Sequence, residues 1–429
     1  MEVSRRKFIG SSTAAVVAAG TLASGKVFGA NEKVSVCCIG IHGQGGSHIR
    51  DITEQEGGEV VALCDVDKNV LEERSAQLKE KTGKQAKLYG DLREVMEDDS
   101  IDAISIATPN HWHSLAAILG CQAGKDVYVE KPISHNIFEG RQLVNAAKKY
   151  NRVVQHGTQS RSNPTLMRDI QLMHEGFLGD IYMAKGFTYK TGNRHSIGHA
   201  EFKSPPDNLN WDLWQGPAER AKYCDNYVHY NWHWFWQYGN GEFGNQLVHE
   251  MDVGVWGLNG GVPIASSSTG GRYIWGDQGV TPNTQVTTFH YANGKTLLME
   301  VRNLGSYKEA GLETTGNTFF GEKGYYVRDH GFFDYDGNPI KVDKELPYSP
   351  HKFYNFFKTV KSRNPADNPC DALVGHISAM HCHIGNTAYR LGRNVRFDPE
   401  TERYIDDPEA NETISREYEK GFEVTEITV

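Results

Sequence analysis

The sequence predicts an α/β protein in which a doubly wound parallel sheet comes first and an α/β domain with a large, mostly antiparallel open sheet follows. Three observations lead to this prediction. A glycine-rich turn follows the first apolar run, strand-like and helix-like segments then alternate up to about residue 155, and β-rich runs separated by Gly, Asn and Pro come after it. A chain of 429 residues is long enough for each domain to bury its own core.

Residues 34–65 have the pattern of a strand, a glycine turn, a helix and a second strand. The apolar run 34–39 stops at Gly40, and the run 60–64 ends in Asp65, which lies 25 positions later (65 − 40). Between the runs, glycines recur at Gly43, Gly45 and Gly46. Glycines let a backbone approach a pyrophosphate, the helix start offers free N–H groups, and a carboxylate roughly 20 positions on accepts from ribose hydroxyls. The pattern predicts a Rossmann domain that binds a dinucleotide.

The loop departs from the usual G-x-G-x-x-G, because position 42 holds histidine. It reads Gly40-x-x-Gly43-x-Gly45, and an ordinary strand-to-helix turn is the alternative interpretation. We assign the cofactor to Gly40, His42, Gly43, Gln44, Gly45 and Asp65. Asp65 would repel a 2′-phosphate and only Lys68 is a nearby cation, so NAD is the expected cofactor and NADP the alternative.

The composition describes a soluble globular protein, with 38% hydrophobic and 23% charged residues. The net charge of −9 argues against a nucleic-acid partner, which would favour a basic face. No apolar run outside the first thirty residues is long enough to span a bilayer, so we expect no membrane insertion.

The N-terminus has the features of a twin-arginine export signal. Ser4-Arg5-Arg6-Lys7-Phe8-Ile9 precedes a mildly apolar run over 14–23. We therefore expect residues 1–30 to engage the twin-arginine (Tat) export machinery and the mature protein to be periplasmic. Such cargo folds in a reducing compartment, so we expect the seven cysteines to be buried free thiols.

The remaining elements follow in order. In the first domain, residues 31–155, helices are expected over 70–84, 111–123 and 138–150 and strands over 101–107, 126–129 and 152–155. The second domain, residues 156–345, has expected strands at 182–189, 285–291, 296–302 and 324–328. Residues 346–429 carry helices at 352–362 and 373–391 and a tail, which we expect to pack back on the core.

Loops at the carboxyl ends of parallel strands face the cofactor cleft, which is where Thr108-Pro109 and Glu130-Lys131-Pro132 fall. These two motifs, the Gly40 loop, His113, and Gly239-Asn240-Gly241 leading to His249-Glu250-Met251-Asp252 resemble the Gfo/Idh/MocA family of NAD(P)-dependent oxidoreductases. The resemblance implies a second domain whose open sheet forms the interface of a homodimer or homotetramer. It also implies that the cofactor contacts Thr108, Pro109, His113, Glu130 and Lys131.

The resemblance further implies that Lys131 lies at the nicotinamide and the reacting hydroxyl, and that His249 is the acid/base, with Asp252 nearby. Oxidation of a sugar hydroxyl needs such a base and a positive group beside the developing alkoxide. The family commonly has aspartate four residues before this histidine, and this chain has Asn245, one helical turn from His249. The alternative interpretation of Lys131 is a surface lysine before a turn proline. The alternative interpretation of His249 is a helix histidine capped by a neighbour.

Two further segments carry candidate substrate contacts. The polar stretch 155–161 follows the last strand of the first domain, and we assign His156 and Arg161 to the cleft, against a solvated crossover loop. The aromatic stretch 229–236 offers Trp234 for stacking on a sugar, against an aromatic core or a subunit interface. His229 and His233 are four apart, but no carboxylate completes a ligand set, so we predict no metal site.

We therefore expect a periplasmic NAD(P)-dependent oxidoreductase that acts on a hydroxyl or keto group of a sugar or glycoside. Export would require a tightly bound cofactor that is recycled internally. One alternative is redox-neutral glycoside hydrolysis through a transient 3-keto sugar. Another is a non-catalytic sugar-binding protein, which the departures at His42 and Asn245 suggest.

Overall fold

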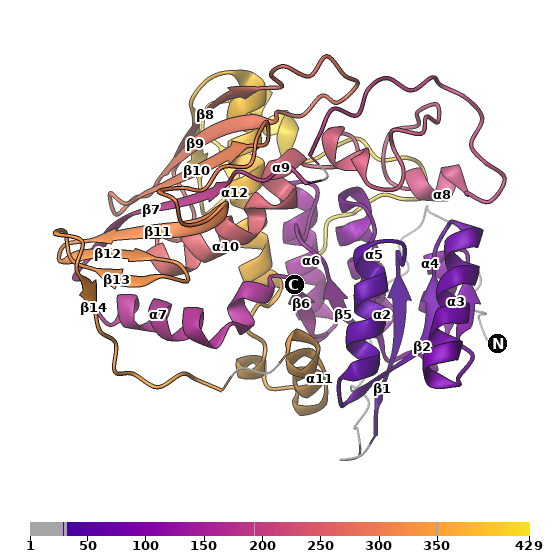
Figure 1. The fold of residues 1–429 in the computed structure, drawn as a ribbon. Coiled ribbons are helices and arrows are strands. Elements are labelled where there is room, and N and C mark those ends of the chain that lie inside the picture. Colours follow the sequence, from indigo (N-terminus) through magenta and orange to yellow (C-terminus); the bar gives the residue numbers. More distant parts are fainter. Residues whose placement is uncertain (1–28, 30–31, 193, 349–350) are drawn as a thin grey trace.

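The predicted doubly wound parallel sheet forms the first domain (Figure 1). The computed structural model describes residues 29, 32–192, 194–348 and 351–429; apart from Gly29, the predicted export signal lies outside them. Six parallel strands follow the order β3-β2-β1-β4-β5-β6. The elements are β1 (Val34–Ile39), α2 (Gln44–Glu54), β2 (Gly58–Cys64), α3 (Lys68–Thr82), β3 (Lys87–Tyr89), α4 (Leu92–Glu97), β4 (Ala103–Ile106), α5 (Asn110–Gln122), β5 (Asp126–Val129), α6 (Ile137–Lys149) and β6 (Val154–His156).

Local sequence explains where these elements begin and end. The Asp67 carboxylate caps α3 by accepting from the backbone N–H groups of Asn69 and Val70, and α3 ends at Gly83 in the left-handed conformation. Every residue of β4 and β5 is buried. Burial along the whole strand is expected for parallel strands covered by helices on both faces.

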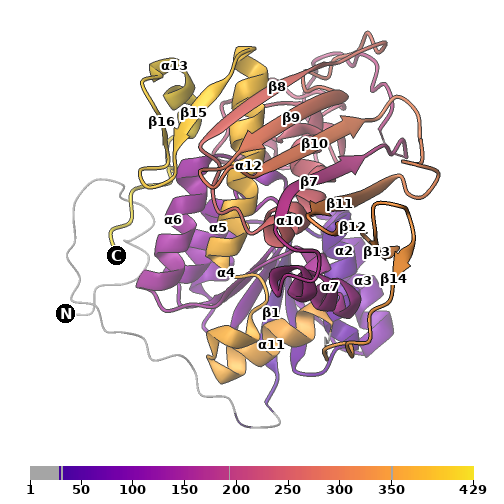
Figure 2. The ribbon, with the colours of Figure 1, turned by 90° about the vertical axis from the view of Figure 1, so that its left-hand side faces the viewer.

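The second domain is built on a ten-stranded sheet in the order β14-β13-β12-β11-β7-β10-β9-β8-β15-β16 (Figure 2). Within it β7 and β10 pair in parallel, and the other neighbours are antiparallel, as predicted. The strands are β7 (Ile181–Thr188), β8 (Ala265–Gly271), β9 (Thr284–His290), β10 (Thr296–Arg302), β11 (Thr315–Gly321), β12 (Gly324–Val327), β13 (Gly331–Phe333), β14 (Pro339–Ile340), β15 (Val395–Asp398) and β16 (Arg403–Tyr404).

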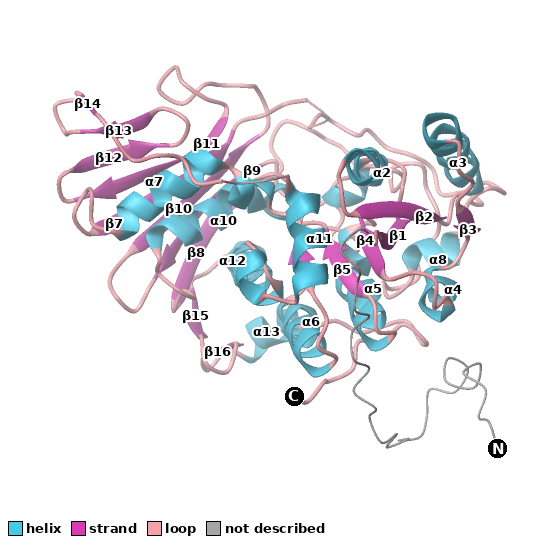
Figure 3. Ribbon diagram, turned by 90° about the horizontal axis from the view of Figure 1, so that it is seen from below, coloured by secondary structure: helices cyan, strands magenta, loops and turns pink. Residues whose placement is uncertain are grey.

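Helices cover one face of this sheet. The helices that follow β6 in the described chain are η1 (Gln159–Ser162), α7 (Pro164–His174), α8 (Trp211–Gln215), η2 (Asn231–Trp234), α9 (Gly241–Asn245), α10 (Leu247–Leu258), α11 (Lys352–Ser362), η3 (Pro365–Asp367), α12 (Ala372–Leu391), α13 (Pro408–Asn411) and η4 (Glu412–Ile414). Helices α10 and α12 lie against the sheet, and α12 also lies beside α6 of the first domain (Figure 3). In β9 and β10 buried residues alternate with partly exposed ones, as expected when one face is covered.

A long excursion between β7 and α9 reaches over the carboxyl ends of the first-domain strands (Figure 1). We call residues 194–240 the covering segment. Its backbone bonds the first domain from Lys68 N to Asn208 O at 2.9 Å and from Asn210 N to Val66 O at 2.9 Å. Its own core is a buried cluster of rings that includes Trp211, Trp214, Tyr227, Trp234 and Tyr238.

The model supplies three further observations about the described residues. All seven cysteines are buried, as expected. Among the described residues, no helix combines the length and the apolar character needed to cross a membrane. No cluster of three or more His, Cys, Asp or Glu side chains suited to a metal ion occurs in the described part of the chain.

Helix α11 belongs to the first domain's core although it lies about 200 residues beyond it in sequence. Phe356 is fully buried in one cluster with Val36, Cys38 and Leu63. We predict that Phe356→Ala lowers the free energy of unfolding by about 3–5 kcal/mol, because a buried ring is replaced by a cavity. Urea denaturation measures this. The matched change Leu373→Ala, at a residue 43% exposed, should cost less than about 0.5 kcal/mol; equal losses would contradict the packing.

Candidate active site

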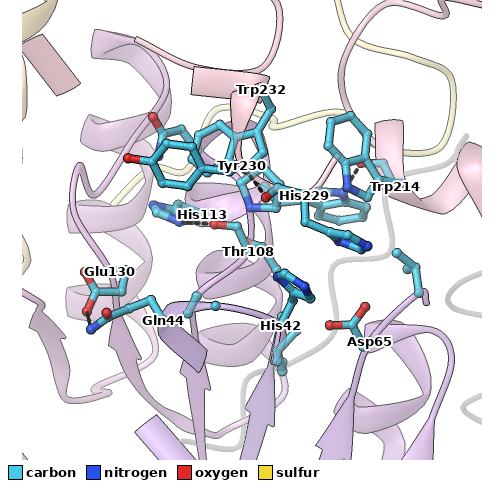
Figure 4. A pocket seen from close by; sticks show the side chains of 18 of the residues that line it. His42, Gln44, Asp65, Thr108, His113, Glu130, Trp214, His229, Tyr230 and Trp232 are labelled. Atoms are coloured by element: carbon cyan, nitrogen blue, oxygen red, sulfur yellow. Dashed lines mark hydrogen bonds between the residues drawn. The ribbon is translucent and has the colours of Figure 1, made fainter. Parts of the chain in front are cut away.

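A cavity of about 480 Å³ lies at the carboxyl ends of β1, β2, β4 and β5, beneath the covering segment (Figure 4). The glycine loop, Asp65 and Trp214 line it together with Lys131, Asn245 and His249. All the cofactor residues predicted from the sequence except Gly45 contribute to its wall. These are Gly40, His42, Gly43, Gln44, Asp65, Thr108, Pro109, His113, Glu130 and Lys131, with Gly45 packed directly behind.

The glycines leave room at the start of α2. Gly40 has φ +75°, and a Cβ there would lie 2.7 Å from Thr108 N, while a Cβ on Gly45 would lie 2.0 Å from Gly40 O. A Cβ on Gly43 would meet nothing within 4 Å, and no side chain caps the helix. The buried hydroxyl of Thr108 bonds no other described group. Open N–H groups and an unpartnered hydroxyl at a helix start fit the phosphates of a dinucleotide.

The Asp65 side chain bonds the backbone of the glycine loop. Its Oδ2 atom accepts from Ile41 N at 2.8 Å, and its Oδ1 atom accepts from Asp67 N at 2.9 Å. Burial raises the pKa of Asp65, while these two backbone bonds act to lower it. Each carboxylate oxygen keeps further acceptor capacity on the cavity side. The side chain can thus hold the loop and still accept from ribose hydroxyls.

The imidazole at position 42 stacks on the covering segment. His42 and His229 lie with ring centroids 4.2 Å apart and an interplanar angle of 14°, and His229 Nε2 lies 3.1 Å from Asp67 Oδ2. Burial, His229 and Arg74 together lower the pKa of His42. We call His42, His229 and Asp67 the clasp. It joins the glycine loop to the covering segment at the wall of the cavity, where Figure 4 shows His42 beside His229.

Two first-domain side chains hold the loops after β4 and β5. Glu130 Oε1 accepts from His48 Nε2 at 3.0 Å and from Gln44 Nε2 at 3.2 Å. Burial alone would raise the pKa of Glu130, but the bond and charge of His48 outweigh it and hold that pKa well below its usual range. The His113 ring bridges the two loops, with Nδ1 2.7 Å from Pro132 O and Nε2 2.8 Å from Thr108 O.

Lys131 reaches into the second domain. Its Nζ atom donates to Asn245 O at 2.8 Å and lies 3.5 Å from Asn245 Oδ1. Burial lowers the pKa of Lys131, and the carboxylates of Glu130 and Glu242 oppose that effect. The ammonium therefore rests against a neutral amide group at the cavity wall.

His249 is a second titratable group that lines the cavity. Burial, followed by the charge of Lys131, lowers the pKa of His249 to about 3. Its imidazole is accordingly neutral near pH 7, with a ring nitrogen that can accept a proton. Asn245 and His249, predicted to lie one turn apart, both line the cavity.

The model does not bring four predicted substrate residues to the cavity wall. Arg161 Nε bonds Asp252 Oδ2 at 2.9 Å, and the fully buried Asp252 also accepts from Ser378 Oγ at 2.7 Å. His156 is buried beside Cys370, with Nδ1 3.6 Å from Sγ, and burial lowers its pKa to about 4. Trp234 is 3% exposed, inside the ring cluster of the covering segment. Long-range partners that the sequence cannot reveal hold Arg161, Asp252 and His156 away from the cavity, whereas Trp234 packs within its own segment.

Four neighbours of Trp234 line the cavity instead: His229, Tyr230, Trp232 and His233. His233 stacks on Trp232 with centroids 3.6 Å apart, and its Nδ1 lies 2.6 Å from Tyr230 O. The aromatic stretch in the sequence pointed to this segment. The segment forms the 3₁₀ turn η2 and not an α-helix, and this turn determines which rings face the cavity. Glu242 and Arg194, which stand behind the wall, had no local signal in the sequence.

Buried neutral histidines make stability depend on pH. Burial is the main cause that lowers the pKa of His111 and His383 to about 3 and that of His381 to about 4. The unfolded chain binds protons as pH falls below about 6.5, whereas the folded chain does not until about pH 3–4, so stability is lost as pH falls through this window. Each group contributes about 1.4 kcal/mol per pH unit.

We therefore predict a lower urea midpoint at pH 5 than at pH 7.5. His383→Gln should lessen this dependence, whereas His195→Gln, at an exposed residue, should leave it unchanged. A midpoint independent of pH between these values would contradict the burial of neutral rings.

Comparison with known proteins places this site in a family. A family model described as an oxidoreductase family with an NAD-binding Rossmann fold matches residues 34–158. A second model, the C-terminal alpha/beta domain of an oxidoreductase family, matches residues 171–424. The WlbA dehydrogenase from Chromobacterium violaceum, solved with NADH and UDP-GlcNAcA, superposes with a TM-score of 0.65 at 20% identity, over 85% of this chain and 96% of that one.

Curated relatives match over a shorter stretch. A glycosyl hydrolase family 109 protein of Shewanella pealeana is 30% identical over 173 residues, which are 38% of this chain and 37% of the relative. An alpha-N-acetylgalactosaminidase of Shewanella oneidensis is 26% identical over 190 residues, 40% of each chain. The match thus spans less than half the length of these relatives. Because the second family model alone covers more than half of the sequence, the chain belongs to the Gfo/Idh/MocA oxidoreductase family, with an NAD-binding Rossmann domain at its start.

Proposed function

We propose that this protein oxidises a hydroxyl group of an uncharged sugar or glycoside, using NAD that stays bound between turnovers. The observation that carries the proposal is that the glycine loop and Asp65 line the same cavity as Lys131 and His249. Gly40, Gly43 and Asp65 would hold the cofactor. When bound, NAD supplies the acceptor for the hydride of the substrate carbon.

Two side chains of the protein would handle the proton of the reacting hydroxyl and the negative charge that develops on its oxygen. His249, which lines the same cavity as Lys131, accepts the proton of the reacting hydroxyl. Burial lowers its pKa to about 3, which leaves the ring neutral and able to accept at pH 7, although as a weaker base than an ordinary histidine. The Lys131 ammonium stabilises the negative charge that develops on that oxygen. Because Lys131 Nζ is held by Asn245 O at 2.8 Å, it keeps one direction for the substrate.

The charges around the cavity favour an uncharged substrate. Three nearby arginines are paired with buried carboxylates: Arg161 with Asp252, Arg194 with Glu242 and Arg328 with Glu250. Among the described residues that line the cavity, Lys131 is the only lysine or arginine. A diphosphate or a uronate would lack a cation beyond the one that the chemistry uses. Tyr230 and Trp232 offer rings that can pack on the C–H faces of a sugar.

A second candidate is redox-neutral glycoside cleavage, favoured by the names of the curated relatives. Oxidation at one sugar carbon would make the neighbouring C–H acidic. Removal of that proton expels the glycosidic oxygen, water adds to the resulting double bond, and the keto group is reduced again. The hydride taken in the first step returns in the last, so no external oxidant is needed.

This route suits the proposed export to the periplasm through the twin-arginine pathway. Assembly through the open sheet of the second domain is part of the same proposal.

The clasp should slow cofactor release. A stacked ring pair contributes about 0.5–1.5 kcal/mol, so we predict that His42→Gly speeds NAD dissociation by about two- to tenfold. The rate is measured by trapping released NAD from the purified protein with an excess dehydrogenase. His195→Ala, outside the clasp, serves as the control. An unchanged rate in His42→Gly would show that the stack does not restrain the cofactor.

The proposed function is tested by incubating the purified protein, without added cofactor, with sugars and aryl glycosides. Mass spectrometry should detect a keto sugar, or aglycone release with deuterium from D₂O at the carbon beside the oxidised one. Lys131→Met should reduce turnover by at least about a thousandfold, because the positive charge at the reacting oxygen is lost. Nicotinamide absorbance should be retained, because the glycine loop and Asp65 are unchanged. Turnover that survives this change would refute the assignment of Lys131.

A further inference from the structure

The amide of Asn245 lies between Lys131 and a buried carboxylate from the same short helix. Asn245 Nδ2 donates to Glu242 Oε2 at 3.1 Å and to the Tyr230 hydroxyl at 3.3 Å. A carboxylate only accepts, so it requires the NH₂ side of the amide to face it. The carbonyl oxygen Oδ1 is consequently turned toward Lys131 Nζ, 3.5 Å away.

Glu242 is itself held in place. Its side chain is 1% exposed, and its Oε1 atom accepts from Arg194 Nε at 2.9 Å. Arg194 belongs to the covering segment, Glu242 and Asn245 belong to α9, and Lys131 follows β5 of the first domain. Burial raises the pKa of Glu242, and the charge of Arg194 and the hydrogen bonds from Asn245 and Arg194 act against that rise. The covering segment therefore fixes the charge that stands behind the amide.

We propose that Glu242 is a positioning residue for Lys131: through the Asn245 amide it orients the ammonium toward the substrate and supplies a negative charge one group away. Arg194 of the covering segment holds Glu242 in place. The ammonium is therefore fully oriented only when the covering segment packs against α9. The inference rests on the proposed function, because an oriented ammonium serves a reaction at the substrate oxygen.

The arrangement leaves Lys131 charged without direct contact between it and Glu242. Direct contact with a carboxylate would compete with the developing alkoxide for the same ammonium protons. An amide oxygen at 2.8 or 3.5 Å directs the ammonium but carries no net charge to compete. The more distant Glu242 still acts on Lys131 through space, and it is one of the groups that raise the Lys131 pKa.

The test follows the reactivity of Lys131 and needs no substrate. The purified protein is labelled with trace acetic anhydride between pH 6 and 10, and the rate at each lysine is read by mass spectrometry. In Glu242→Gln the neutral amine should be more abundant, so Lys131 should be labelled about threefold faster or more near pH 8. The other charges that act on Lys131 stay in place: Glu130, Arg194 and Glu250, with His233 and His249 facing it.

The chain supplies a matched control. Glu139 and Arg416 form a buried pair like that of Glu242 and Arg194, with an N–O distance of 2.8 Å against 2.9 Å and carboxylates 0% and 1% exposed. Glu139→Gln should leave the labelling of Lys131 at the wild-type rate. The double change Glu242→Gln with Asn245→Asp, which returns a carboxylate beside the ammonium, should slow the labelling again. If Glu242→Gln does not fold, Glu242→Asp, which withdraws the acceptor from Asn245, should change the rate in the same direction.

Two results would overturn the proposal: wild-type labelling of Lys131 in the Glu242 variants, or an equal change in Glu139→Gln. The failure of the proposed function would look different, since Lys131 would still respond to Glu242 while no sugar was oxidised. Once a substrate is known, Glu242→Gln should lower kcat by about tenfold or more with KM little changed, because an interaction made in the transition state is weakened. A loss confined to KM would also contradict the positioning role.

Discussion

The hydrogen bond from the Lys131 ammonium to the backbone carbonyl of Asn245 joins the two domains at the point where chemistry is expected. Lys131 follows a strand of the parallel sheet, and Asn245 ends a helix of the second domain. The cavity exists because α9 and α10 are brought against the carboxyl ends of the first-domain strands, and because the covering segment closes over both. Each of these contacts is long-range, so the site depends on the relative placement of the two domains.

The cost of burying charge explains why most charged side chains at or behind the cavity wall are paired. Desolvation makes an isolated buried ion unfavourable, and Glu130, Glu242 and Asp252 each have a basic partner, His48, Arg194 and Arg161 respectively. Lys131 differs, because its nearest partner is a neutral amide. Among the described residues that line the cavity, Lys131 thus carries a positive charge that no close ion pair neutralises. A group that must stabilise a transient negative charge needs this property.

The sequence was informative where the signal is local. The turn at Gly40, the acid at Asp65 and the lysine after β5 follow directly from apolar runs that end in a particular residue, and their places in the fold agree with prediction. Prediction from the sequence was weaker where a partner lies far away. Arg161 was expected to meet substrate, but Asp252, 91 positions later, binds it. Trp234 was chosen from an aromatic stretch whose 3₁₀ turn instead directs Tyr230 and Trp232 to the cavity.

The two departures from the family pattern both have partners that the sequence did not connect to them. His42 removes a glycine from the loop, yet its ring stacks on His229 and lines the cavity. Asn245 lacks the charge of an aspartate, yet Glu242 stands 3.1 Å behind its amide. A protein that had lost its reaction would have no need to keep a buried, paired carboxylate in that place, where burial carries a cost in stability. Compensation at both positions therefore argues for a working enzyme and against a binding protein that has merely kept the fold.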